Sequence, residues 1–198
     1  MTRISANITV ATARSKSDSL EVEIKLAVPG PGVARRLLRA TGFRVVKPRV
    51  FESNEVLDTP EQLLRNGGLL LRIRSVKREV ILTYKGRLRN SKHKSREELE
   101  VCASDAYMLA AILARLGFER MFRYEKYRTE FRRGRTGVVT LDETPIGTYL
   151  ELEGEPAWID RTARLLGFTE ADYITLSYGQ LYLDWCARQG CKAGDMVF

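Results

Sequence analysis

The chain has 198 residues, of which 44% are hydrophobic and 29% are charged, as expected for a soluble globular domain with an apolar core. Its formal net charge of +8 suits an anionic partner such as a polyphosphate or a nucleic acid. A single histidine, His93, excludes sites built from several histidines, and three cysteines without paired spacing exclude a disulfide framework.

No apolar run is long enough to cross a membrane, so we expect no membrane association. The first nineteen residues are rich in Ser, Thr and basic residues, and their only apolar run is too short for a signal peptide. We therefore expect residues 1–19 to form a flexible tail, residues 20–190 to form one domain, and the protein to reside in the reducing cytoplasm. Residues 191–198 are expected to be a loose tail.

The first predicted strand, residues 20–28, alternates charged and apolar residues with the period of two that a β-strand requires. Glu21, Glu23 and Lys25 share one face of this strand, and the opposite face is apolar. Two carboxylates and an ammonium in a row are unusual on a strand that merely faces bulk water. We therefore expect the charged face to contact other charged groups.

The rest of the chain mixes strands and helices. Strands are predicted at residues 43–58, 69–76, 79–85, 96–101, 118–132, 137–142 and 147–152. Helices are predicted at residues 33–41, 62–66, 105–116, 156–166 and 173–188. Ser104 is expected to cap the third of these helices. Residues 86–95 carry basic residues and no acid, which predicts a mobile basic loop.

Most of these strands repeat the division into a charged and an apolar face. The charged faces add Arg72, Arg74, Lys85, Arg96, Glu98, Glu100, Lys126, Arg128, Asp142, Glu151 and Glu153 to the three residues of the first strand. The apolar faces must be buried, and the helices can pack against them. The charged faces must share a solvated interior. A closed antiparallel barrel with a polar lumen, and with helices outside, meets both demands.

These charged faces carry seven acidic and seven basic residues. A network of ion pairs that only holds the barrel closed would explain the balance of charge. It would not explain like charges about 7 Å apart on one strand face, such as Arg72 beside Arg74. A divalent cation would neutralise the carboxylates, and a polyanion would neutralise the bases. The pattern therefore favours a metal-dependent polyphosphate site.

The segment Glu21-x-Glu23-x-Lys25 resembles the ExExK signature of the CYTH superfamily, the triphosphate tunnel metalloenzymes. The resemblance continues in family order through residues 57–60, 71–74, 82–86, 96–100, 126–128, Asp142 and 147–153. It covers about residues 20–185. It implies an α+β fold, an eight-stranded antiparallel tunnel with helices packed outside, and cleavage of a triphosphate substrate.

The resemblance also implies roles for the charged residues and a need for Mg²⁺ or Mn²⁺. Catalytic roles fall to Glu21, Glu23, Lys25 and Glu153. Substrate-binding roles fall to Lys25, Arg72, Arg74, Lys85, Arg96, Lys126 and Arg128. Metal-binding roles fall to Glu21, Glu23, Glu98, Glu100, Asp142, Glu151 and Glu153. For Arg96, Glu98 and Glu100 the division between metal and phosphate binding is left open.

Three functions are compatible with these residues. The first is a metal-dependent triphosphatase acting on inorganic triphosphate or on an organic or nucleoside triphosphate. The second is a class IV adenylyl cyclase, which makes cyclic AMP and pyrophosphate from ATP. The third is a binder of polyphosphate without catalysis. Nucleic acid binding through residues 87–94 is disfavoured, because basic residues elsewhere are interleaved with acids. The pattern does not select the substrate or an oligomeric state.

Overall fold

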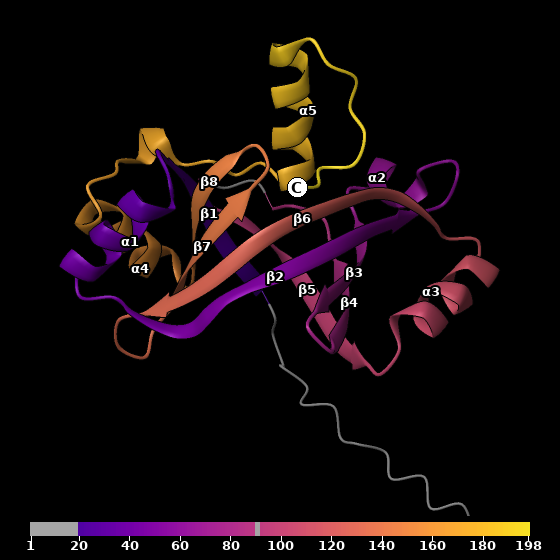
Figure 1. Ribbon diagram of the computed structural model, residues 1–198, viewed down its shortest axis with the longest axis horizontal. Coiled ribbons are helices and arrows are strands. Elements are labelled where there is room, and N and C mark those ends of the chain that lie inside the picture. Colours follow the sequence, from indigo (N-terminus) through magenta and orange to yellow (C-terminus); the bar gives the residue numbers. More distant parts are fainter. Residues whose placement is uncertain (1–19, 90–91) are drawn as a thin grey trace, which may run out of the picture.

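The computed structural model describes residues 20–89 and 92–198, and its centre is a closed barrel of eight antiparallel strands (Figure 1). The strands follow one another around the barrel in the order β1-β5-β4-β3-β2-β6-β7-β8. Their bounds are β1 (Leu20–Val28), β2 (Arg44–Asp58), β3 (Leu70–Val76), β4 (Glu79–Lys85), β5 (Lys94–Ala103), β6 (Glu119–Arg132), β7 (Val138–Thr144) and β8 (Gly147–Glu153). The predicted eight-stranded barrel is confirmed. The predicted flexible tail, residues 1–19, lies outside the described residues.

The helices lie outside the barrel, as predicted (Figure 1). They are α1 (Pro31–Ala40), α2 (Leu63–Asn66), α3 (Ala106–Arg115), α4 (Pro156–Leu165) and α5 (Tyr178–Gln189), with a short 3₁₀ turn at Glu170–Asp172. In Figure 1, α1 and α4 lie beside β1, β7 and β8, and α3 lies at the opposite side of the barrel. In the part of the chain that is described, no helix combines the length and the apolar character that a membrane span requires.

The apolar faces of the strands pack on these helices. Ile24 and Leu26 of β1 are fully buried in one cluster with Leu38 of α1 and Ile159 of α4. A second cluster joins Ile73 of β3 to residues of β2, β4 and α3. Because side chains alternate along a strand, burying these apolar residues turns their charged neighbours into the barrel.

Two helix starts differ from the prediction. Asp105, and not Ser104, caps α3, because its carboxylate accepts a hydrogen bond from the Met108 amide. The last helix begins at Tyr178 rather than at residue 173, with Ser177 as its cap. The residues before it are extended, since Ile174 pairs through its backbone with Lys25 of β1.

The C-terminal segment is held against the barrel, which differs from the expected loose tail at residues 191–198. Met196 is 1% exposed and forms a parallel bridge with Tyr124 of β6. Its amide donates to the Arg123 carbonyl, and its carbonyl accepts from the Glu125 amide, both at 2.9 Å. The Phe198 amide donates to Glu125 Oε2 at 3.2 Å. The segment therefore continues the fold beyond residue 190.

Substitutions at two neighbouring residues of β3 test which face of this strand packs in the apolar core. Ile73→Ala is expected to lower the free energy of unfolding by about 2–4 kcal/mol, because Ile73 is 2% exposed and packs in an apolar cluster. Arg74→Ala should change it by less than about 1 kcal/mol, because this side chain lies in the lumen and is partly solvated. Urea unfolding of both variants measures the difference. A larger loss for Arg74→Ala would contradict this assignment of the two faces.

Candidate active site

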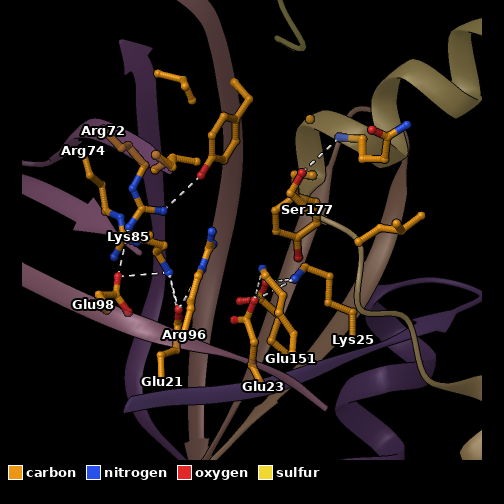
Figure 2. A pocket seen from close by; sticks show the side chains of 18 of the residues that line it. Glu21, Glu23, Lys25, Arg72, Arg74, Lys85, Arg96, Glu98, Glu151 and Ser177 are labelled. Atoms are coloured by element: carbon orange, nitrogen blue, oxygen red, sulfur yellow. Dashed lines mark hydrogen bonds and ion pairs between the residues drawn. The ribbon is translucent and has the colours of Figure 1, made fainter. Parts of the chain in front are cut away.

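A cavity of about 1370 Å³ runs through the barrel and is lined by residues of all eight strands. Of the residues predicted to form the site, all but Asp142 line it. Among these predicted residues, the basic side chains come from β1, β3, β4, β5 and β6, and the acidic ones come from β1, β5 and β8. Figure 2 shows two neighbouring groups of these side chains, one around Lys85 and the other around Glu23.

The first group is arranged around Lys85. Its Nζ lies 2.7 Å from Glu21 Oε2 and 3.0 Å from Glu98 Oε1. Arg72 reaches within 3.7 Å of Glu98, and Arg96 within 3.6 Å of Glu21. Burial, together with repulsion from nearby carboxylates, raises the pKa of Glu21 despite the contact with Lys85. One lysine therefore bridges carboxylates of two strands that the sequence separates widely.

The second group is arranged around Glu23 and Glu151. Lys25 Nζ lies 3.2 Å from Glu23 Oε1 and 3.1 Å from Glu151 Oε1. Lys94 also pairs with Glu23, and Arg128 pairs with Glu151. Burial acts to raise the pKa of both carboxyls, but the cations beside them hold each pKa well below its usual range. Both carboxylates are therefore ionised at neutral pH.

Asp142 points into the barrel but lies behind side chains that line the cavity, and its metal-binding role stays a prediction. Its side chain is fully buried. It accepts hydrogen bonds from Lys126 Nζ at 2.7 Å, from Arg128 Nε at 2.7 Å and from the Tyr178 hydroxyl at 2.8 Å. Both carboxylate oxygens are thus engaged by donors. This arrangement suits a residue that orients two cations, and it leaves no exposed oxygen for a metal ion.

Glu153 is the exception to the pairing of charges. It stands opposite Glu23 across the β1–β8 pair, and no ion pair with it is found within residues 20–89 and 92–198. Partial burial, followed by repulsion from Glu21 and Glu23, raises the pKa of Glu153 to about 7. Its side chain is nevertheless exposed to the lumen. The site therefore holds one carboxyl that lacks a counter-charge.

The carboxyls near Glu153 are of the chemical type that a divalent cation binds, although they do not converge on one point. Glu21, Glu23 and Glu153 supply carboxylate oxygens from adjacent strands, the ligand type that Mg²⁺ and Mn²⁺ prefer. As the side chains stand, no three Asp, Glu, His or Cys residues of the described chain converge on one point. Lysines hold Glu21 and Glu23 in this arrangement. A cation would relieve the repulsion from Glu21 and Glu23 that adds to burial in raising the pKa of Glu153.

Lys94 is a lumen residue that the sequence analysis missed. It was assigned to a mobile basic loop, yet it opens β5 and is only 6% exposed. Burial, together with repulsion from neighbouring cations and against the attraction of Glu23, lowers the pKa of Lys94 to about 8. Its spacing of two from Arg96 places both on one strand face, and this alternation could have revealed it. The expected mobility of residues 86–95 differs from the structure at Lys92 and His93, which bind Asp160 of α4.

Three other residues inside the barrel, Glu52 among them although it does not line the cavity, were not among the residues predicted for the site. Glu52 lies 3.7 Å from Lys126, and although burial acts to raise its pKa, this lysine and neighbouring arginines lower it to about 2. The Tyr124 hydroxyl accepts a hydrogen bond from Arg72 at 3.1 Å. Tyr178, at the start of α5, contacts the lumen from above β7 and β8. Alternation does not mark Glu52, because polar residues stand on both faces of residues 52–55.

The family model of the CYTH domain matches residues 19–173. The chain belongs to the CYTH domain family. This CYTH protein is 27% identical over 147 residues to "Putative adenylate cyclase MJ0240" of Methanocaldococcus jannaschii, a match that spans 74% of this chain and 83% of that protein.

Two solved structures share the fold. PH1819 from Pyrococcus horikoshii OT3 is 27% identical, with a TM-score of 0.71 over 83% of this chain and 99% of that one. "Putative adenylyl cyclase HpAC1" from Hippeastrum is 21% identical, with a TM-score of 0.61 over 87% of this chain and 97% of that one. The latter is described as having a dominant triphosphatase activity.

Glu153→Gln is expected to remove a pH-dependent loss of stability. Because the pKa of Glu153 in the folded protein is about 7, above its ordinary value of 4.5, its stabilising contribution is complete below about pH 4.5. This contribution is lost as the pH rises through about 7. Relative to the variant, the wild type should lose about 1 kcal/mol over this range, since water in the cavity screens the repulsion.

Urea unfolding in metal-free buffer at pH 4.5 and at pH 8 measures this difference. Glu143→Gln is the matched control, because Glu143 lies on the outer face, where it binds Arg35 and Arg49. If Glu153→Gln keeps the pH dependence of the wild type, Glu153 is not the group that titrates.

Proposed function

We propose that this CYTH protein hydrolyses a triphosphate substrate within the barrel, with the help of a divalent cation. The observation that supports this proposal is the enclosure of two unlike surfaces in one cavity. Basic side chains that suit phosphate oxygens line one part: Lys25, Arg72, Arg74, Lys85, Arg96, Lys126 and Arg128. Carboxyls without a full complement of cations, Glu153 above all, line another.

The basic residues are already oriented for phosphate. Arg72 donates to the Tyr124 hydroxyl at 3.1 Å and to Thr83 Oγ1 at 3.2 Å, so its guanidinium is held at the lumen surface. Asp142 orients Lys126 and Arg128 from behind. Phosphate oxygens of a substrate would replace the lumen carboxylates as partners of these cations. Positioned cations stabilise the charge that develops on the transferring phosphoryl and the leaving group.

The carboxylates would hold the cation. Glu21, Glu23 and Glu153 are the residues that this proposal assigns to it, and when bound it neutralises charge on the phosphate oxygens. Lys25 and Lys94 keep Glu23 ionised, as a metal ligand must be. Water is the attacking nucleophile in the hydrolase.

A class IV adenylyl cyclase is the second candidate. Phe122 stacks on Tyr124 and on Tyr182, with distances between ring centroids of 5.8 Å and 5.9 Å. All three aromatic residues border the cavity. Such a surface can contact a nucleobase, and the name of the relative from Methanocaldococcus jannaschii also favours this candidate. The ribose 3′-hydroxyl would then replace water as nucleophile. The activity described for the Hippeastrum protein favours hydrolysis as the first candidate.

Product analysis distinguishes the two candidates. The protein is incubated with inorganic triphosphate, thiamine triphosphate or ATP in Mg²⁺ or Mn²⁺. We expect phosphate release from at least one of them and its loss in EDTA. Cyclic AMP with pyrophosphate from ATP would select the cyclase, and binding without any product would select the polyphosphate binder. Full turnover in EDTA would contradict the need for a metal.

Glu23→Gln should lower kcat by about 100-fold, because it keeps the shape of the side chain and removes a charge from the proposed cation site. The control is Glu143→Gln, which removes an equally paired strand carboxylate from the outer face and should leave kcat unchanged. Steady-state assays with the best substrate measure both. Equal activity of the two variants would contradict the assignment of Glu23.

Inorganic triphosphate with Mg²⁺ should raise the melting temperature, because the ligand binds the folded barrel and not the unfolded chain. At 100 times its Kd, one ligand adds about 2.7 kcal/mol to the free energy of unfolding. Sulfate at equal ionic strength is the control for screening alone. A lumen that serves only as an internal ion-pair network predicts the same shift with both salts.

A further inference from the structure

The edge of β1 that faces β5 has two successive partners. Four residues of β1, Leu20–Glu23, pair with residues 94–97 of β5. Beyond that point Ile174 replaces β5, since its amide and carbonyl exchange hydrogen bonds of 2.9 Å and 2.8 Å with the backbone of Lys25. We call the place where β5 ends and Ile174 begins the seam. With only four paired residues, the β1–β5 contact is the shortest in the barrel.

A single carboxylate outside the barrel binds both sides of the seam. Asp160 of α4 accepts hydrogen bonds at Oδ1 from His93 Nε2 at 2.8 Å and from the Tyr173 hydroxyl at 3.0 Å. Its Oδ2 lies 2.8 Å from Lys92 Nζ, which also binds Glu170 at 2.6 Å. Burial acts to raise the pKa of Asp160, but these three donors lower it to about 2. Because an ionised carboxylate only accepts, His93 Nε2 carries the hydrogen.

Each residue that Asp160 binds lies next to one that shapes the lumen. His93 borders the cavity and binds Asp160 of α4, and Lys94, the next residue, lines the cavity and pairs with Glu23. Lys92 and His93 lead directly into β5, so their contacts fix where that strand begins.

The other side of the seam is built in the same way. Tyr173 binds Asp160, and the next residue, Ile174, holds the backbone of Lys25. Lys25 Nζ lies 3.2 Å from Glu23. The rings of His93 and Tyr173 lie 5.9 Å apart, so the two sides meet at Asp160. Both lysines on Glu23 thus depend on chain segments that one outer carboxylate joins.

We propose that Asp160 is a positioning residue for the lumen. Through His93 it fixes the start of β5 and so places Lys94 inside the barrel. Through Tyr173 it fixes the segment that hydrogen-bonds Lys25. Its effect on turnover rests on the proposed function, whereas its effect on the seam does not.

The test compares Asp160→Asn with Glu143→Gln, which removes another outer carboxylate that binds two cations. The first measurement is hydrogen exchange of the Lys25 and Ile174 amides, which donate between β1 and Ile174 beside the seam. Asp160→Asn should speed their exchange by about tenfold or more, since local opening becomes easier. The second is acylation of individual lysines followed by mass spectrometry, in which Lys94 should become reactive. Glu143→Gln should change neither.

The third measurement is steady-state turnover of inorganic triphosphate. Asp160→Asn should raise KM by about tenfold and change kcat by less than about threefold, because loosened lysines bind the substrate less well but the reacting groups remain. Asp160→Glu, which keeps an ionised acceptor, should recover part of the loss. Tyr173→Phe removes one hydrogen bond to Asp160 and should act in the same direction, more weakly, if Asp160→Asn does not fold.

The outcomes separate the two proposals. Unchanged exchange at Lys25 and Ile174 and unchanged reactivity of Lys94 would overturn the positioning role. Faster exchange with an unaltered KM would also overturn it, because the seam would then not matter to the lumen. If the wild type turns over no triphosphate, the proposed function fails, and the exchange and acylation results still decide the role of Asp160.

Discussion

Charges enclosed in a barrel must neutralise one another or meet water, and this constraint explains how the lumen is built. Lys85 bridges Glu21 and Glu98, and Lys25 bridges Glu23 and Glu151. These contacts link β4 to β1 across the intervening β5, and β1 to the adjacent β8. An ion pair that is buried costs desolvation, so the network is weak evidence for stability. It is better understood as a set of partners that a charged guest can exchange.

The same constraint explains the outside of the barrel. Because the charged faces turn inward, Ile24, Leu26 and Ile73 face outward. The helices pack against these apolar side chains and shield them from water. The fold is thus inverted relative to a packed small barrel, with its apolar core outside the sheet. A family of tunnel enzymes can vary the lumen without disturbing this core, because the two sets of side chains never share a face.

The strands and their faces could be predicted from the sequence because a period of two is a local property. The lumen position of Lys94 was not predicted, because the basic composition of residues 86–95 indicated a loop. Its spacing of two from Arg96 indicates the strand face correctly. Asp142 shares the parity of a lumen residue, but its burial depends on Tyr178, which comes from a helix 36 residues later. The attachment of Met196 likewise depends on a distant strand. The alternation of residues along one strand does not predict its contacts with a helix or a terminal segment that lies far away in the sequence.

The attachment of Met196 to β6 affects how the C-terminus of this protein can be altered. Its backbone bridges β6 at Tyr124, whose hydroxyl accepts a hydrogen bond from Arg72 in the lumen. A bulky peptide fused close behind Phe198, or proteolysis a few residues before it, would therefore alter the surroundings of Tyr124 and, through it, of Arg72.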